Sequence, residues 1–320
     1  MAQAVSNNFK KDRKLNRRYR LTIQDVDENR EPINTVAVIE NPFTLRFSIN
    51  RNIFEQINHG DFEILNLAPK TYNRLFYDYF TINRYFGDQD GTREVGNSFK
   101  SRIVILEAGY YGMEMSVVFI GDMWSCYTER RGTETITKIH AIVGLRATSI
   151  TSDISFSSTT RNKVLMYLAD DMHLKLKLYD VEDKEITRPV VINGKSFANI
   201  QKYSDDTAFI DNEEIKVLAY NKAFDGDVAL INDESGLLGV PNRENGILSV
   251  NMIFEPRLSV GQIIEIQSRI APMFNGQYKI YGLKHEGIIS EAEAGKVVTN
   301  IQMLVGSQLY GRFGIVKAQQ

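Results

Sequence analysis

The feature that most constrains this chain is a strict two-residue alternation of apolar side chains in its last third. Between residues 248 and 254 every second side chain is apolar, and Pro256 ends the run: Leu248, Val250, Met252 and Phe254. A second run of this kind follows at Val297, Thr299, Ile301, Met303 and Val305. A period of two is that of a strand with one buried face. We therefore predict that the C-terminal third is β-sheet packed on a core.

Turn signals between these runs indicate how the strands connect. A strand is predicted at 262–268, after Gly261, and the alternation resumes at Tyr278 and Ile280. Between them lies Asn275-Gly276, a dipeptide whose residues tolerate positive φ and which is typical of tight hairpins. Short antiparallel strands joined by tight turns predict a small barrel or a curled sandwich.

The N-terminal half has the same character. Phe43, Leu45, Phe47 and Ile49 alternate with polar residues, and further strands are predicted at 20–24, 35–39, 61–67, 102–112, 115–127 and 133–144. Pro69 is suited to the first turn of a helix, since it has no amide hydrogen to leave unpaired. The residues that follow at helical spacing predict an aromatic face that covers the barrel: Tyr72, Leu75, Phe76, Tyr79 and Phe80.

The middle of the chain differs from both β-rich parts. Ser157, Ser158 and Thr159 are suitable N-caps. The helix after them has a predicted buried stripe of Val164, Leu165, Leu168, Ala169 and Met172. We predict a mainly β protein with a few helices (α+β), made of two tube-like antiparallel barrel or sandwich domains and a small α/β insert. The predicted parts are a basic flexible arm at 1–18, a first β domain at 19–150, an insert at 151–225, a second β domain at 226–306 and a tail at 307–320.

Composition excludes several classes of protein. The formal net charge of −2 argues against a general nucleic-acid binder. The single cysteine, Cys126, cannot form an internal disulfide, and no apolar run is long enough to span a bilayer. We expect synthesis in a cytoplasm and no membrane insertion. The basic arm predicts a solvated segment, or alternatively a segment that becomes ordered on an acidic neighbouring subunit.

No stretch of the chain has the pattern of a catalytic or metal site. The run at 189–196, PVVINGKS, ends like a phosphate-binding loop, but Pro189 stands where the first glycine is required, and the Val-Val-Ile that follows favours a strand. The four histidines lack metal-ligand spacing, and adjacent acids on a strand point apart. We therefore expect no enzyme activity, no metal and no cofactor.

Short motifs in both β-rich parts are the basis of a family resemblance. In the first part they are Asn66-Leu67 before the predicted helix, Ala108-Gly109-Tyr110, and the strand end Phe119-Ile120-Gly121-Asp122. In the second part they are Gly-Leu-x-Gly-x-Pro at 236–241, Phe254 to Pro256, and a Gly-x-Tyr strand that leads into a His-x-Gly turn at 276–287. In this order, they resemble the tube-like domains of baseplate hub proteins from contractile-tailed bacteriophages.

The resemblance implies a structural virion protein. Such hubs form homotrimers whose two tube-like domains per subunit continue the hexameric tail tube and join it to the trimeric central spike. The implied partners are the chain itself, the tail tube protein, the spike and other baseplate proteins. The genome would pass through the lumen without sequence-specific binding. The implied location is the baseplate of the virion tail, after assembly in the bacterial host cytoplasm.

We expect residues 133–143 and 248–254 to be the ring-forming strands, with Thr135 and Asn251 facing outward. The predicted subunit-interface residues are Thr133, Thr135, Thr137, Leu248, Val250, Asn251, Met252 and Phe254. Three alternatives remain open: a hub that carries a cell-wall hydrolase, a receptor- or carbohydrate-binding β-barrel tail module, and a distal tail or tube-terminating protein. An equivalent hub of a phage-derived injection particle has the same pattern.

Overall fold

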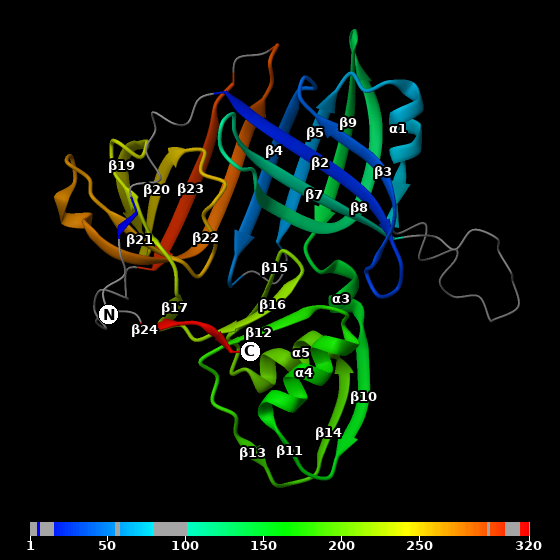
Figure 1. The fold of residues 1–320 in the computed structure, drawn as a ribbon, viewed down its shortest axis with the longest axis vertical. Coiled ribbons are helices and arrows are strands. Elements are labelled where there is room, and N and C mark those ends of the chain that lie inside the picture. The colour runs from blue at the N-terminus through cyan, green and yellow to red at the C-terminus, as the bar shows by residue number, and fades with distance from the viewer. Residues whose placement is uncertain are drawn as a thin grey trace, which may run out of the picture.

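The computed structural model describes residues 5–6, 16–54, 58–79, 101–292, 295–304 and 314–319. Two β regions lie side by side, and a smaller part with most of the helices lies beyond one end of them (Figure 1). Strands dominate the described chain and helices are few, which confirms the predicted mainly β class. No helix in the described residues is both long and apolar enough to cross a membrane.

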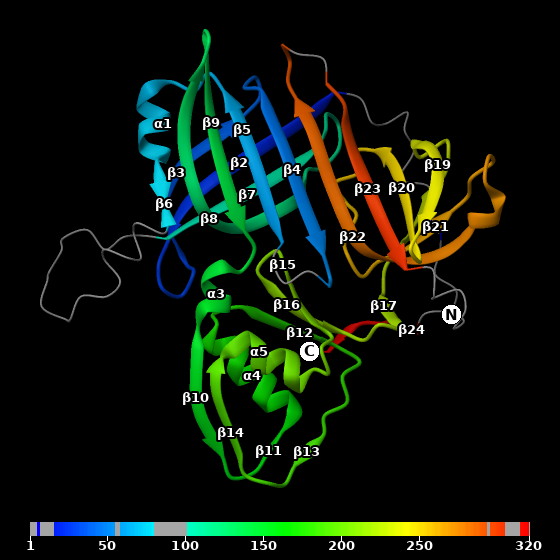
Figure 2. The ribbon, with the colours of Figure 1, turned by 180° about the vertical axis from the view of Figure 1, so that it is seen from behind.

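The first β region is an antiparallel sheet that folds back on itself. It contains β2 (Arg17–Val26), β3 (Pro32–Glu40), β4 (Leu45–Asn52), β5 (His59–Leu65), β7 (Ser101–Tyr110), β8 (Ser116–Arg131) and β9 (Glu134–Ile142). Their order in the sheet is β4-β5-β9-β8-β7-β2-β3. In Figure 2, β4, β5 and β9 lie in front of β2, β7 and the first part of β8. Leu21, Leu45, Phe62, Leu106 and Phe119 are buried between these layers.

The second β region contains β18 (Val228–Ile231), β19 (Leu237–Glu244), β20 (Ile247–Ile253), β21 (Ile263–Ile266), β22 (Gly276–Ile289) and β23 (Val297–Leu304), and β1 (Val5–Ser6) pairs in parallel with β18. The alternation from residue 248 is confirmed, because Leu248, Val250, Met252 and Phe254 are all buried. The alternating residues of β23 from Val297 to Met303 are buried as well, and Val305 lies outside the described residues.

The two β regions share one sheet. Strand β4 of the first region pairs antiparallel with β22 of the second, from Leu45 opposite Ile289 to Asn52 opposite Gly282. Backbone hydrogen bonds therefore continue from one region into the other. Local periodicity did not predict this pairing, because it identifies a strand without identifying its distant partner.

The insert packs two helices between short sheets. It contains α3 (Leu145–Ser149), β10 (Thr151–Phe156), β11 (Thr159–Thr160), α4 (Arg161–Asp171), β12 (Lys175–Tyr179), β13 (Glu185–Ile186), β14 (Val190–Lys195), α5 (Ser196–Tyr203), β15 (Ala208–Asp211) and β16 (Glu214–Leu218). Strands β17 (Lys222–Phe224) and β24 (Gly314–Val316) pair beside it, and β25 (Ala318–Gln319) pairs with β12. The apolar stripe of α4 is buried as predicted. Its N-cap is Thr160, one residue later than the predicted caps, and the Thr160 side chain accepts a hydrogen bond from the Lys163 amide.

The strand interpretation of PVVINGKS is also confirmed. Val190 to Lys195 form β14, which pairs antiparallel with β10 along six residues. Helix α5 begins directly afterwards at Ser196. Because the backbone amides of this run are engaged in a ladder, they do not form the open loop that a phosphate requires.

The predicted aromatic helix is shorter than its spacing suggested. Helix α1 covers Pro69–Leu75, and Leu75 is its only buried residue. Phe76, the C-cap residue, leaves the helical conformation with φ −49° and ψ 128° and is 66% exposed. Strand β6 (Tyr77–Asp78) then pairs with β8 at Cys126 and Ser125. Pairing with the edge of β8 ends α1, so Tyr79, which is helical again after β6, does not share the face of α1. Phe80 lies outside the described residues.

The predicted hairpin between 262–268 and Tyr278 exists, but its turn is of another kind. Strands β21 and β22 pair antiparallel, and a 3-10 turn, Pro272–Phe274, lies between them. Asn275 has a φ of −68° rather than a positive value. Its side chain instead accepts a hydrogen bond from the Ser268 amide at 2.7 Å, which closes a longer loop.

Candidate assembly face

Eight strands from both β regions form one continuous layer, which we call the front sheet: β8, β9, β5, β4, β22, β23, β20 and β19 in that order. Figure 2 shows β9, β5, β4, β22 and β23 of this layer side by side. One face of the front sheet packs on the two hydrophobic cores. The other face is turned away from both cores and extends across the whole width of the two β regions.

Strand register identifies the side chains on that outer face. Asp61 pairs with His140, Glu63 with Lys138, and Ser48 with Asp61. The same rows continue into the second region, where Glu286 pairs with Ser48 and Lys284 with Asn50. We call this set the polar face: Arg46, Ser48, Asn50, Asp61, Glu63, Lys138, His140, Ser249, Asn251, Lys284, Glu286, Asn300 and Gln302. All thirteen side chains are exposed or half-buried, and Arg46 is the register partner of Glu63.

Charges on the polar face are balanced by close neighbours. Lys138 lies 2.9 Å from Glu129 and 3.8 Å from Glu63, and Lys284 lies 2.6 Å from Glu286. The hydrogen bond between Lys138 and Glu129 raises the pKa of the lysine and lowers that of the glutamate. His140 Nδ1 lies 2.6 Å from Asp61 Oδ1. Such a surface is hydrated, and its electrostatic potential does not have one sign over an extended area.

Beneath the polar face, a buried cluster holds the two β regions together. His285 of β22 is fully buried, and its Nδ1 lies 2.9 Å from the Thr299 hydroxyl, which also accepts the Glu255 amide hydrogen. Phe254 contacts Phe47 and His285 edge to face, at ring-centroid distances of 5.9 and 5.6 Å. Burial lowers the pKa of His285 to about 3, so the imidazole is neutral.

A second buried group attaches the insert to the first β region. Arg51 of β4 donates two hydrogen bonds to Asp211, at 2.8 and 2.9 Å, and Lys216 lies 2.8 Å from the same carboxylate. Burial opposes ionisation of Asp211, but the charges of Arg51 and Lys216 outweigh it and hold the pKa well below its usual range.

The two residues after Asp211 extend this attachment. The Asn212 side chain accepts a hydrogen bond from the Ile120 amide at 3.0 Å. Glu213 pairs with Arg30, which also lies 3.0 Å from Asp122 of β8. The turn between β15 and β16 thus connects the insert to the first β region through three consecutive side chains.

The predicted interface residues fall into two groups. Leu248, Val250, Met252 and Phe254 lie in the cores, and Thr137 is fully buried with its hydroxyl 3.1 Å from that of Thr128. These side chains hold the front sheet on its cores and face away from solvent. Thr133 is exposed in the turn between β8 and β9, and Asn251 is exposed on the polar face.

Thr135 does not face outward as expected. It is half-buried, on the same side of β9 as Thr137, because the alternation of that strand is set by the buried residues Ile139 and Ala141. The runs 133–143 and 248–254 belong to the same front sheet, where β5, β4, β22 and β23 separate β9 from β20. Their role in contacts between copies stays a prediction.

The polar face was not predicted from the periodicity of the strands. Its residues occupy the positions between the apolar ones in each strand, and only the β4–β22 pairing brings them into one surface. A signal was present, since the intervening positions of β5 and β9 are rich in charged residues and histidine.

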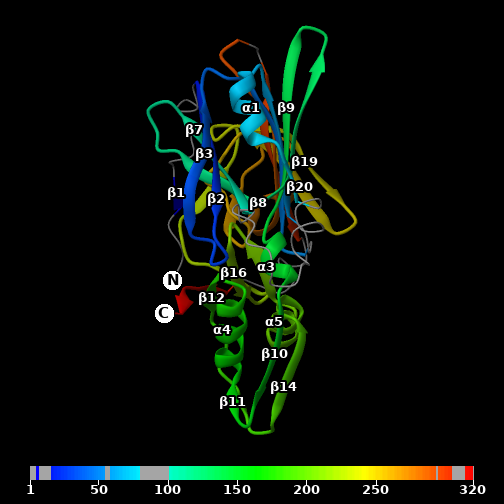
Figure 3. The same ribbon diagram turned by 90° about the vertical axis from the view of Figure 1, so that its right-hand side faces the viewer.

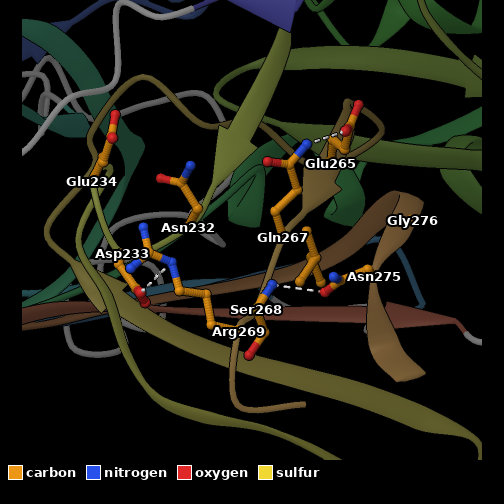
Figure 4. A pocket seen from close by; sticks show the side chains of 10 residues that line it. Asn232, Asp233, Glu234, Glu265, Gln267, Ser268, Arg269, Asn275 and Gly276 are labelled. Atoms are coloured by element: carbon orange, nitrogen blue, oxygen red, sulfur yellow. Dashed lines mark hydrogen bonds and ion pairs between the residues drawn. The ribbon is translucent and has the colours of Figure 1, made fainter. Parts of the chain in front are cut away.

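The structure also contains a surface pocket of about 640 Å³ at the ends of β18 and β21 (Figure 4). Its lining is polar and largely bonded to itself. Asp233 lies 3.6 Å from Arg269, and Gln267 donates a hydrogen bond to Glu265 at 2.7 Å. In the part of the chain that the structure describes, no group of three or more His, Cys, Asp or Glu residues is arranged to hold a metal ion.

Comparison with known proteins connects this architecture to phage tails. A family model described as Baseplate hub gp41 matches residues 21–292. A search among curated proteins finds no match.

Solved structures share the fold at very low sequence identity. A tail protein from Neisseria meningitidis MC58 has a TM-score of 0.56 at 9% identity, over 90% of this chain and 97% of that one. The 43 kDa tail protein of prophage MuSo2 from Shewanella oneidensis has a TM-score of 0.55 at 7% identity, over 90% and 98%. The E. coli c3393 protein, a component of the type VI secretion system, has a TM-score of 0.51 at 9% identity, over 82% and 74%.

Proposed function

The chain belongs to the Baseplate hub gp41 family, and from this premise we propose that it joins the hexameric tail tube of the virion to the trimeric central spike. Members of this family are structural components of the phage baseplate. In the proposed role three copies form a ring, and the genome passes through its centre.

The observation that carries this proposal is the front sheet, which crosses both β regions without a break. Each copy supplies two β regions to one wall. Three copies therefore supply six such regions, and a ring with threefold symmetry offers six similar positions to a hexameric tube. On the side that faces the spike, the same ring has exact threefold symmetry, which matches the symmetry of a trimeric spike.

The polar face suits the lining of a channel for a polyanion. Proteins hold nucleic acid chiefly through cationic side chains that replace its counterions. Here Lys138 and Lys284 are each paired with a neighbouring glutamate. A wall of this kind is wetted and offers few unpaired cations, so DNA passes without being retained.

The insert is the natural candidate for contacts with other baseplate proteins. It lies beyond one end of the front-sheet strands (Figure 2), and buried ion pairs fix it to the first β region. A partner that binds the insert would thereby be oriented relative to the channel wall.

The test is the mass of the purified protein in solution, alone and mixed with its spike protein, measured by light scattering. The proposal predicts a trimer, or a monomer that becomes a three-to-three complex with the spike. A stable monomer that does not bind the spike would contradict it and favour a receptor- or carbohydrate-binding tail module, which a glycan-binding assay would then examine.

A further inference from the structure

Lys279 of β22 is a buried lysine at the place where the insert meets the second β region. It is 8% exposed, and its Nζ donates hydrogen bonds to the carbonyl oxygens of Ala219 and Tyr220, at 3.1 and 3.3 Å. Within the described residues, no carboxylate forms an ion pair with it. Lysines are almost never fully buried unless they are paired, and an unpaired buried cation tends to lose its charge.

The two carbonyl groups belong to the segment that leads from the insert to the second β region, residues 219–225, which we call the connector. Its strand β17 lies between these two parts (Figure 1), and the insert lies beyond one end of both β regions (Figure 3). The Ala219 carbonyl also accepts the Lys222 amide hydrogen at 3.0 Å. Lys279 therefore holds a closed turn, residues 219–222, which we call the connector turn.

The rest of the connector is held by other contacts. The Phe224 amide donates to the Gly261 carbonyl at 3.1 Å, and β17 pairs with β24. In the connector turn, Tyr220 is half-exposed, its ring lies 5.6 Å from that of Phe54, and its hydroxyl bonds to the Asp206 carbonyl. The hydrogen bonds from Lys279 are the contacts that attach this turn directly to β22.

The arrangement of acceptors around the Lys279 nitrogen fits a neutral amine. A neutral amine has two N–H groups, and the site offers two carbonyl oxygens. An ammonium has a third N–H group that needs a further acceptor, and a charge that needs an anion or water. The charged side chains of the connector have other partners, since Lys222 lies 2.8 Å from Asp180. Asp225 likewise lies 3.3 Å from Lys317.

Strand β21, beside Lys279 in the sheet, is apolar at this position. Ile263 is the register partner of Lys279 and is 4% exposed. Two residues further along the same face, Glu265 accepts a hydrogen bond from Gln267 at 2.7 Å. Burial therefore lowers the pKa of Lys279 to about 7.

We propose that Lys279 is a pH-dependent switch that attaches the connector turn to β22 when its amine is neutral and releases the turn when the amine takes a proton from the solvent. The ammonium turns towards water, and both hydrogen bonds to the carbonyl groups are lost. The insert stays on the first β region, because Arg51 and Asp211 remain charged. The link between the insert and the second β region is thereby loosened. This switch is a property of each copy and does not require the proposed ring.

The attachment becomes tighter as the pH rises. The pKa of Lys279 is 10.5 in the unfolded chain and about 7 in the folded protein. The state with the turn released binds a proton more readily in this interval, so the attachment is lost as the pH falls from 10.5 to 7. His285 changes its protonation below pH 6.5, so the two groups can be measured separately.

The experiment is hydrogen exchange of the full chain at pH 7 and 9, read by mass spectrometry in the connector turn and, as a reference, in β5. K279M removes the titrating amine, and K279R keeps a positive charge at both pH values. The matched control K222M removes the other lysine at this place, which is half-buried and paired with Asp180. Variants are compared at the same pH, which cancels the intrinsic pH dependence of exchange.

The inference predicts that protection of the connector turn, relative to K279R, rises at least tenfold from pH 7 to 9 in the wild type and in K222M. In K279M this ratio should stay constant, and β5 should not respond in any variant. A constant ratio in the wild type would overturn the switch. An equal rise in β5 would also overturn it, because the whole fold would then be responding.

A second measurement applies if K279M and K279R do not fold. The protection of the connector turn relative to β5 is then followed in the wild type and K222M alone, and a ratio that is the same at pH 7 and 9 overturns the switch. Because the spike is absent from these measurements, they stay separate from the test of the proposed function.

Discussion

The two β regions of this protein are built from the same kind of strand but are anchored differently. The first region and the insert share one continuous hydrophobic cluster, reinforced by the buried ion pairs of Arg51 and Arg30. The second region has its own cluster, formed mainly by β18 and β20–β23. It joins the first region through the β4–β22 pairing and the residues around His285. The first region and insert thus form one unit, and the junction at β22 is the seam between this unit and the second region.

The largest expected effect comes from breaking the attachment of the insert. D211A leaves Arg51 and Lys216 buried without their carboxylate, which costs about 3–5 kcal/mol of unfolding free energy. Urea denaturation measures the loss. Hydrogen exchange should show faster opening in the insert and β4, with a smaller change in β20. The control D205N removes the charge of a largely exposed partner of Arg161 at a position whose φ of 54° asparagine tolerates, and it should cost under about 1 kcal/mol. Equal losses in the two variants would contradict the proposed anchoring.

The seam is expected to weaken in acid through His285. Its pKa falls from 6.5 in the unfolded chain to about 3 in the folded protein. The unfolded state therefore binds a proton more readily in this interval, and stability is lost as the pH falls below 6.5. The slope of the unfolding free energy against pH approaches about 1.4 kcal/mol per pH unit, and the loss between pH 6.5 and 5 is about 1.6 kcal/mol.

H285F removes the titrating group and should flatten this part of the stability curve. Urea midpoints of the wild type and H285F, measured at several pH values, test the prediction. Parallel curves for the two proteins would show that another group is responsible.

A smaller loss of stability is expected when the hydrogen bond between Tyr110 of β7 and the seam is removed. The Tyr110 hydroxyl donates to the Phe254 carbonyl at 2.7 Å. Y110F keeps the ring and removes the donor, which costs about 1 kcal/mol. The matched control Y220F removes a hydroxyl from a half-exposed ring that bonds to the Asp206 carbonyl at 3.1 Å, and a loss well below that of Y110F is expected. Thermal unfolding of both variants checks the ranking, and the reverse order would contradict it.

The smallest expected effect tests whether the two β regions line one channel. D61K changes the polar face in the first region and E286K changes it in the second. In the assembled ring each substitution should tighten binding of a short DNA duplex by about three- to tenfold and steepen its salt dependence. E182K makes the same charge change on an exposed side chain of the insert and should have less effect. Fluorescence anisotropy at two salt concentrations measures all three, and a response to only one of the face variants would contradict a shared channel wall.

Sequence patterns predicted a substantial part of this architecture. Alternation identified the strands of both β regions and the buried side of β20 and β23, because burial of one face imposes a period of two. Helical spacing identified the stripe of α4. The same logic placed Leu248 and Thr137 at a subunit interface, although alternating apolar side chains in a sheet pack first on the core of their own chain.

Long-range partners could not be predicted in this way. Arg51 and Asp211 are 160 positions apart, and nothing local to either residue indicates the pairing. The length of α1 was misjudged because the edge of β8 captured Tyr77 and Asp78 from a sequence that also fits a helix. The polar face depends on the β4–β22 register, which only the folded chain establishes.

The most direct test of the central claim is electron cryomicroscopy of the protein bound to its spike, at a resolution that separates strands. We predict a ring of three copies in which the polar face, from β9 to β20, lines a continuous channel and the two β regions alternate around it. A ring with any other number of copies, or one whose channel is lined by the insert, would contradict the account.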